Sequence, residues 1–320
     1  MTAEIDRVTA AFTARLGSLD LPLPGSGRTE QRWSGLAELA REDLAVARLA
    51  EGHVDAVAIL AELAGPAPRP GTRWGVWAAE PPHPVLGAEQ RPDGWRLTGT
   101  KPWCSGAHAC THALVTARAG EQRRLFAADL GTGSTAPVEG TWPAVGMAGS
   151  DSGAVRFDAT PAVAVGAPGA YVERPGFWHG AIGVAACWYG GATGIADALL
   201  AQARAGRADP HALAHLGAVD AALHAAARTL TAAAREVDAD PADGAGHGQT
   251  RARRVRAVVE ASCEEVLRHV GRATGAGPHG RDAAFSRRVA DLTVYLRQSH
   301  AERDLAALGT LLADGAEASW

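Results

Sequence analysis

The segment DGWRLTGTKPWCSGAHACTHALVTAR, residues 93–118, contains two β-rich runs separated by a turn of small residues. Trp103 and Ser105 stand two positions apart, at the point where the first run ends. Because alternate residues of a strand face the same side, a strand through this point would present a flat apolar ring and a hydroxyl to one ligand. The pair is therefore a candidate binding site for a flat molecule.

Short β-rich runs extend on both sides of this segment. RWGVWAAE precedes it, and QRRLFAADL and GAVRFDA follow it, with Gly, Asp and Pro between the runs. Runs of this length separated by turn residues are typical of strands. The pattern predicts an all-β region at roughly residues 70 to 165.

Helical patterns flank the β-rich region. Residues 29–64 repeat apolar side chains at helical spacing, and Gly65 with Pro66 supplies a stop. From Phe177 onward we expect four long helices in an antiparallel bundle, the fourth running through residues 286–312. Glycines in the first of them would let another helix approach closely. The predicted fold class is α+β, with a short N-terminal helical unit (1–66), a middle β-barrel-like domain (67–170) and a C-terminal four-helix bundle (171–320).

Composition narrows the function classes. Charged residues are 21% of the 320 residues and the net charge is −4, which argues against a nucleic-acid groove or a basic membrane-binding face. The N-terminal stretch lacks the pattern of a signal peptide, and we expect no apolar run that approaches the roughly 18 residues of a membrane span. We therefore expect a cytoplasmic protein without nucleic-acid or membrane partners. The four cysteines lack paired spacing, which predicts buried free thiols.

The order of these regions and four motifs resemble the acyl-CoA dehydrogenase family of flavoproteins. The motifs are residues 93–118, VGMAGSDSGAVRFDAT at 145–160, RWGVWAAEPP at 73–82, and residues 272–309, which are similar to the family's two C-terminal helices. The resemblance covers most of residues 33–313 and implies an FAD cofactor. The chain would be a short, divergent member.

The resemblance implies roles for particular residues. Trp103 would pack against the isoalloxazine ring, and Ser105 would bond the N5–O4 edge of the flavin, with Cys104 between them in the same contact segment. Ala78 and Ala79 would belong to the strand whose backbone contacts the flavin pyrimidine, where Ala79 replaces a threonine and Glu80 and Pro81 are kept. Gly275 and Gly277 would approach the cofactor of a neighbouring subunit, which implies an oligomer.

The chain departs from the family at the catalytic base. The family uses a glutamate to take the α-proton of a thioester, and counting from Asp291 puts Ser299 at that position. The alternative position falls near Val184 and Ala185, and neither residue is acidic. The arginine that grips the cofactor pyrophosphate, followed by Phe-Gly in many members, is also missing, with Arg204 and Arg207 as substitutes of weaker fit.

Three explanations of the missing base stay open. His300 or Glu302 can act as the catalytic base, although a carboxylate within AERD is more typical of a solvated helix surface. The protein can instead be a flavin-dependent monooxygenase of the same fold, which needs no base for an α-proton. Finally, it can be the base-lacking partner subunit of a hetero-oligomeric dehydrogenase.

Two further groups of residues are weaker candidates. Cys104, His108, Cys110 and His112 would share one side only on a strand unbroken through Gly106, and we predict no metal there. His53 is predicted to be a packed helix histidine. The leading prediction is FAD-dependent α,β-oxidation of an acyl thioester, with the electron acceptor and the acyl chain undefined.

Overall fold

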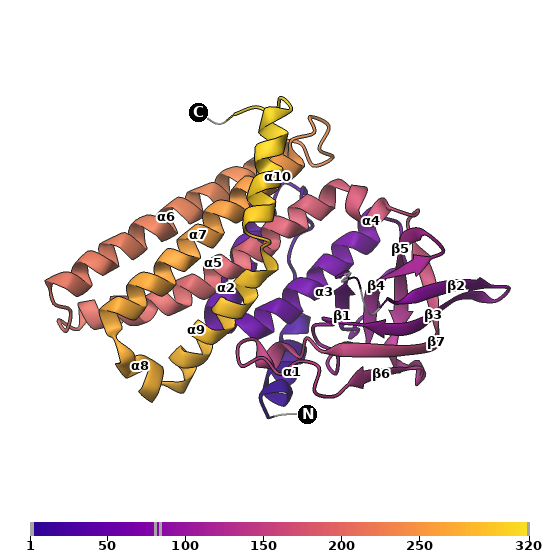
Figure 1. Cartoon of the computed structure of the whole chain (residues 1–320), viewed down its shortest axis with the longest axis horizontal. Coiled ribbons are helices and arrows are strands. Elements are labelled where there is room, and N and C mark those ends of the chain that lie inside the picture. Colours follow the sequence, from indigo (N-terminus) through magenta and orange to yellow (C-terminus); the bar gives the residue numbers. More distant parts are fainter. Residues whose placement is uncertain (1–2, 80–81, 83–84, 319–320) are drawn as a thin grey trace. The chain divides into compact units, whose positions relative to one another are not determined.

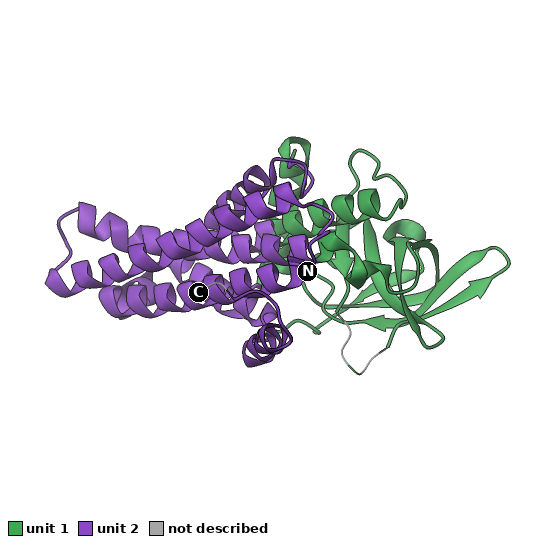
Figure 2. Cartoon of the chain, turned by 90° about the horizontal axis from the view of Figure 1, so that it is seen from above, with its two compact units in different colours: residues 1–20, 48–144, 148–177 green, residues 21–47, 145–147, 178–320 purple. Residues whose placement is uncertain are grey.

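The computed structural model describes residues 3–79, 82 and 85–318 (Figure 1). The chain forms two compact units (Figure 2). Unit 1 contains residues Met1–Asp20, Arg48–Ala144 and Ala148–Phe177, and unit 2 contains Leu21–Ala47, Val145–Met147 and Trp178–Trp320. The predicted division at residues 66 and 170 stays a prediction.

A closed sheet forms the centre of unit 1. Its strands among the described residues are β1 (Trp74–Trp77), β2 (Gly87–Arg91), β3 (Gly94–Lys101), β4 (His112–Ala119), β5 (Gln122–Asp129), β6 (Thr135–Val138) and β7 (Ala154–Val165). The order β4-β2-β3-β7-β5 closes because β5 also pairs with β4, while β1 lies beside β4 and β6 beside β7. The expected β-barrel-like domain is therefore present.

Successive residues of a strand point to opposite faces, so the strand residues of unit 1 pack into two apolar cores. On β4, Val115 packs inside the barrel while Leu114 faces outward, and on β5, Phe126 is inside while Leu125 is outside. The outward residues pack against Ile59 and its neighbours on α3 (Leu44–Glu62). Each face of these strands thus has an apolar partner, which gives the barrel a fixed register.

Short helices complete unit 1. Helix α1 (Ala3–Arg15) buries Val8 and Phe12, and η1 (Leu16–Ser18) follows it. Gly149, in the 3₁₀ turn η3 (Ala148–Ser150), lets α1 approach, because a Cβ there would lie 2.5 Å from a Val8 methyl. The remaining elements are η2 (Leu130–Thr132) and α4 (Ala170–Glu173).

Helices, most of them long, make up the described elements of unit 2. They are α2 (Thr29–Glu42), α5 (Pro175–Arg204), α6 (Pro210–Ala239), α7 (Gly248–Thr274), α8 (Ala276–Arg281), α9 (Ala283–Tyr295), η4 (Leu296–Gln298) and α10 (Glu302–Ala313). Asp209 caps α6 by accepting from the Ala212 amide, and Asp282 caps α9 by accepting from two amides. The C-terminal region is helical, as predicted.

The glycines of α5 permit the close helix approach expected from the sequence. A Cβ on Gly190 would lie 2.0 Å from the Ala37 carbonyl oxygen of α2, and one on Gly194 would lie 2.6 Å from the Arg41 carbonyl oxygen. Both distances are far shorter than a van der Waals contact. The backbones of α2 and α5 therefore touch only because these positions lack side chains.

The fourth bundle helix is broken, whereas the sequence pattern predicted one continuous helix over 286–312. Ser299 is extended, and Ala301 has φ 45°. Polar side chains take the backbone amides here, because Ala301 donates to Ser299 Oγ and His300 donates to the Asp304 carboxylate. No large apolar residue lies between Leu296 and Leu305, so packing does not oppose the break.

Helix α5 also corrects the expectation about membrane-length segments. It is long and apolar enough, by length and composition, to cross a membrane. In its most apolar window, however, 61% of the residues are buried inside the structure. Fully buried side chains such as Ile182, Trp188 and Leu199 account for this apolar character through packing within the protein.

Candidate functional site

Trp103 lies in a turn and not on a strand. Strand β3 ends at Lys101, Pro102 lacks the amide needed to continue a ladder, and Gly106 adopts φ 73°. The expected alternation through residues 103 and 105 is therefore wrong. Trp103 itself has φ 57°, which bulky residues rarely adopt, and 55% of its surface is exposed.

The turn is held by the segment 150–153. The Cys104 amide of the turn donates to Gly153 O (2.7 Å), and the Gly106 amide donates to Ser150 O (2.8 Å). The Ala107 amide donates to Asp151 O (3.2 Å), and the His108 amide donates to the Asp151 carboxylate (2.7 Å). The amide of Ser105, between these donors, bonds no acceptor among the described residues. One backbone donor beside the exposed Trp103 ring is thus left for a ligand.

Ser105 is fixed from both sides. Its carbonyl oxygen accepts from the indole nitrogen of Trp77, at 3.0 Å, and its hydroxyl lies 2.8 Å from that of Ser152. The Ser152 hydroxyl in turn lies 2.8 Å from the hydroxyl of Ser150. The turn therefore presents a hydroxyl that belongs to a buried chain of three.

The thiol of Cys104 belongs to the barrel core. It is fully buried and contacts the Lys101 carbonyl oxygen at 3.1 Å, and burial raises its pKa well above the ordinary value. The Cys104 amide is also bonded, to Gly153 O, so the predicted contact of Cys104 with a cofactor stays a prediction. None of the four cysteines forms a disulfide and all four are buried, as predicted.

Ala78 and Ala79 follow β1, the strand joined to the turn through Trp77 and Ser105. The Ala78 carbonyl oxygen accepts from the Arg123 guanidinium at 2.7 Å. Glu80 and Pro81, which the sequence comparison also used, lie outside the described residues. The predicted contact of Ala78 and Ala79 with a cofactor stays a prediction.

The Cys and His residues that were weighed and rejected as metal ligands do not form a cluster. Within residues 3–79, 82 and 85–318, no group of three His, Cys, Asp or Glu side chains has the geometry for a metal ion. His108 bonds Asp151 at 2.9 Å, and His112 stacks on Trp74 with ring centroids 4.8 Å apart. Burial raises the pKa of Cys110 to about 12, which keeps this thiol protonated.

His53 is a packed histidine, as predicted. Its Nδ1 accepts from the Trp74 amide at 3.2 Å, and its ring lies edge-on to Phe12. Burial lowers the pKa of His53 to about 4, because the charged ring would lose its hydration. His53 is therefore neutral at physiological pH and ties α3 to β1.

The remaining predicted site residues belong to unit 2. Gly275 ends α7 with φ 62°, and Gly277 is exposed within α8, with open space around both Cβ positions. His300 is exposed in the break before α10 and lies near the Asp304 carboxylate, and Glu302 is exposed on the first turn of α10. Their roles stay predictions.

Ser299 has a partner that the sequence did not reveal. Its hydroxyl donates to the carboxylate of Glu260 on α7, thirty-nine positions earlier in the chain. Asp291, from which the base position was counted, is buried and accepts from the Met147 amide. A carboxylate therefore lies beside the position where the family has its glutamate, although it comes from another helix.

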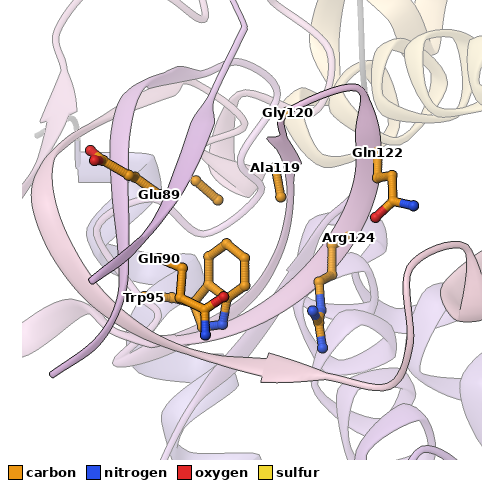
Figure 3. A pocket seen from close by; sticks show the side chains of 8 residues that line it. Glu89, Gln90, Trp95, Ala119, Gly120, Gln122 and Arg124 are labelled. Carbon is orange, nitrogen blue, oxygen red and sulfur yellow. The ribbon is translucent and has the colours of Figure 1, made fainter. Parts of the chain in front are cut away.

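A separate hollow of about 440 Å³ includes Trp95, at the start of β3, in its lining (Figure 3). Trp103 follows the other end of that strand. Its lining consists of Ala88, Glu89, Gln90, Trp95, Ala119, Gly120, Gln122 and Arg124. Trp95 packs on Phe126, and the Arg124 guanidinium lies 5.4 Å from its ring centroid. None of the predicted cofactor residues lines this hollow.

Solved structures share the fold over nearly the whole chain. The complex of TdsC from Paenibacillus sp. A11-2 with FMN and indole matches with a TM-score of 0.80 at 19% identity, covering 99% of this chain and 97% of that one. KijD3 in complex with FMN and a dTDP-amino-keto sugar matches at 0.75 and 17%, covering 99% and 92%. Methanesulfinate monooxygenase MsuC from Pseudomonas fluorescens matches at 0.73 and 18%, covering 99% and 98%.

No family model matches the sequence, and no curated protein does. At these identities the structural matches show the fold alone. The fold is the acyl-CoA dehydrogenase-like fold: N-terminal helices, a middle β-barrel and a C-terminal helical domain. The predicted fold class is confirmed.

Sequence reasoning missed Ser150, Ser152, Trp77 and Glu260. Ser150 and Ser152 stand in GSDSG, within a motif already singled out, and the close spacing of two hydroxyls in a glycine-bounded turn was a usable signal. No sequence signal identified Glu260, since nothing distinguishes its position from others on α7. Only the three-dimensional fold brings it to Ser299.

Proposed function

We propose that this chain is a flavin-dependent monooxygenase that binds FMN at the 102–110 turn and oxygenates a small molecule. The observation with the most weight is Trp103, an exposed ring in a disfavoured backbone conformation, beside the unbonded amide of Ser105. The exposed indole can stack on the face of an isoalloxazine ring, and the unbonded amide can donate to its polar edge. These residues fit a flavin.

Two observations favour oxygenation over the predicted oxidation of an acyl thioester. Counting from Asp291 puts Ser299 where the resemblance would require a glutamate, and the solved structures of the same fold include complexes with FMN and enzymes named as monooxygenases. The missing pyrophosphate-gripping arginine agrees with FMN, which has one phosphate and no pyrophosphate. We therefore propose FMN in place of FAD.

The chain's own residues would bind and orient the ring. Trp103 would cover one face, which excludes water from that face, and Ser105 would bond the N5 edge through its hydroxyl and amide. Reduced FMN would supply the two electrons that activate O2 for transfer of one oxygen atom. A substrate without an acidic α-hydrogen would then need no protein carboxylate as base.

Thioester oxidation is a second candidate because of Glu260. This carboxylate, bonded by Ser299, is the acidic group that the fold brings to the expected base position. In that case Glu260 would take the α-proton of the thioester. The earlier candidates His300 and Glu302 are both solvent-exposed, whereas Glu260 is partly buried.

Two parallel assays separate the candidates, an anaerobic one with thioesters and one with O2. Purified protein is loaded with oxidised FMN or FAD and mixed with acyl-CoA thioesters, and in parallel loaded with reduced FMN and mixed with ¹⁸O2 and small sulfur, nitrogen or aromatic compounds. We expect ¹⁸O in a product only with reduced FMN, and no bleaching by thioesters. Bleaching by a thioester that is lost in Glu260→Gln would instead establish dehydrogenation and contradict the proposal.

A further inference from the structure

Three serine hydroxyls form a buried chain behind the proposed flavin site. Ser105, Ser152 and Ser150 are joined by two contacts of 2.8 Å, and their exposed fractions are 9%, 7% and 0%. The Asp151 carboxylate, between the two serines in sequence, is used by the amide and the ring of His108. Asp151 has φ 47°, so the backbone is held in a conformation that brings both hydroxyls to one side.

Each hydroxyl has one proton, so the chain has a direction. If Ser105 donates outward to a ligand, it must accept from Ser152, and Ser152 must accept from Ser150. If Ser105 accepts from a ligand, the Ser105 hydroxyl donates to Ser152 and the Ser152 hydroxyl donates to Ser150. Rotation about the three C–O bonds converts one arrangement into the other without moving a heavy atom.

A flavin needs both arrangements. N5 of oxidised flavin is a hydrogen-bond acceptor, whereas N5 of reduced flavin has a proton and donates. We propose that Ser152 is a positioning residue that directs the Ser105 hydroxyl and lets it reverse between oxidised and reduced FMN. This inference rests on the proposed function and adds to it a residue that would act without touching the cofactor.

The two redox states respond differently to loss of Ser152. With reduced FMN, Ser105 accepts from N5–H and its own proton needs Ser152 as acceptor, so removal leaves a buried donor without a partner. With oxidised FMN, Ser105 still donates to N5 and loses only one accepted bond. Since an unsatisfied buried donor costs more than one lost bond, Ser152→Ala should weaken binding of reduced FMN roughly tenfold and of oxidised FMN less than threefold.

The test measures the dissociation constants of oxidised and reduced FMN, and the midpoint potential of bound FMN, for the full-length protein. Ser152→Thr keeps the hydroxyl and should restore wild-type values. Ser134→Ala is the matched control, because Ser134 is the middle hydroxyl of another three-hydroxyl chain, between Thr132 and Thr160 in the same unit. The unfolding midpoint of each variant checks that the fold is kept.

The predicted result is a lower midpoint potential for Ser152→Ala alone, from preferential loss of reduced FMN. Equal weakening of both redox states, or the same shift in Ser134→Ala, would overturn the role of Ser152 while leaving the flavin proposal intact. Wild-type protein that binds neither form of FMN would overturn the proposed function and this inference together.

Discussion

At position 103 the backbone adopts a conformation that a bulky side chain disfavours by roughly 1–2 kcal/mol. Trp103 has φ 57° and most of its ring is exposed, so burial of the ring within the described fold does not compensate for that cost. Strain of this kind persists where surrounding bonds hold it, and the four donors to segment 150–153 do so here. The ligand-binding role proposed for Trp103 agrees with this strain.

The sequence identified Trp103 and Ser105 as candidate site residues, but it did not predict how the two residues are arranged. Pro102 and Gly106 are both turn signals, and they argued against the strand that was expected to align the two side chains. The pairing through Ser152 depends on a segment about fifty positions away. Contacts of that kind leave no local pattern in the sequence. The types of the site residues were therefore predictable, whereas their positions in the fold were not.

His53 gives a prediction about pH. Its pKa is about 4 in the folded protein and about 6.5 when unfolded, so the unfolded chain takes up the proton first as the pH falls. The stabilisation from neutral His53 is complete above pH 6.5 and is lost toward pH 4, by about 1.4 kcal/mol per pH unit and about 3 kcal/mol in total. We expect this loss in urea unfolding measured from pH 7 to pH 4.5.

His53→Asn is the control for that measurement. Its amide oxygen can still accept from the Trp74 amide, but it does not titrate. The stability difference between wild type and His53→Asn should shrink or reverse as the pH falls. A difference that stays constant over this range would show that His53 is not buried in the neutral form.

For individual strands and helices, the spacing of apolar and small residues predicted packing contacts that the structure contains. Alternation on β4 and β5 matches their two apolar faces, and the small residues of α5 match its close approach to α2. The break between α9 and α10 was not predicted, because the prediction followed the apolar residues on either side and did not weigh the polar side chains that take the backbone amides between them. Local competition for hydrogen bonds is therefore where the element predictions failed.

Gly190→Ala tests the packing of α5. The new methyl group would lie 2.0 Å from the Ala37 carbonyl oxygen, and a backbone atom in a helix cannot move aside without shifting α2. We expect a loss of about 3 kcal/mol or more in the free energy of unfolding. Urea titration followed by circular dichroism at 222 nm measures it.

Gly217→Ala on α6 is the matched substitution, because no heavy atom lies within 4 Å of its added Cβ. Helix propensity alone should make this variant more stable by up to about 1 kcal/mol. If the two alanine variants have the same stability, the close approach of α2 and α5 is not the reason for glycine at position 190.

For the whole molecule, the order of helices, barrel and helices identified the fold even though each motif was weak. Fold-level likeness does not decide the reaction, since one fold supports several chemistries. The deciding residues are few: Ser299 in place of a base, Glu260 beside it, and the strained turn with Trp103. The proposed flavin-dependent function rests on these residues, and it does not require proton abstraction from a thioester.

The central claim is that the 102–110 turn binds a flavin ring, and a titration of FMN into the purified full-length protein tests it most directly. We expect saturable quenching of FMN fluorescence by the stacked indole, weakened roughly tenfold or more in Trp103→Ala and unchanged in Val163→Ala, which removes a similarly exposed apolar side chain from the same unit. Unquenched FMN with the wild-type protein, or equal affinity in Trp103→Ala, would contradict the claim.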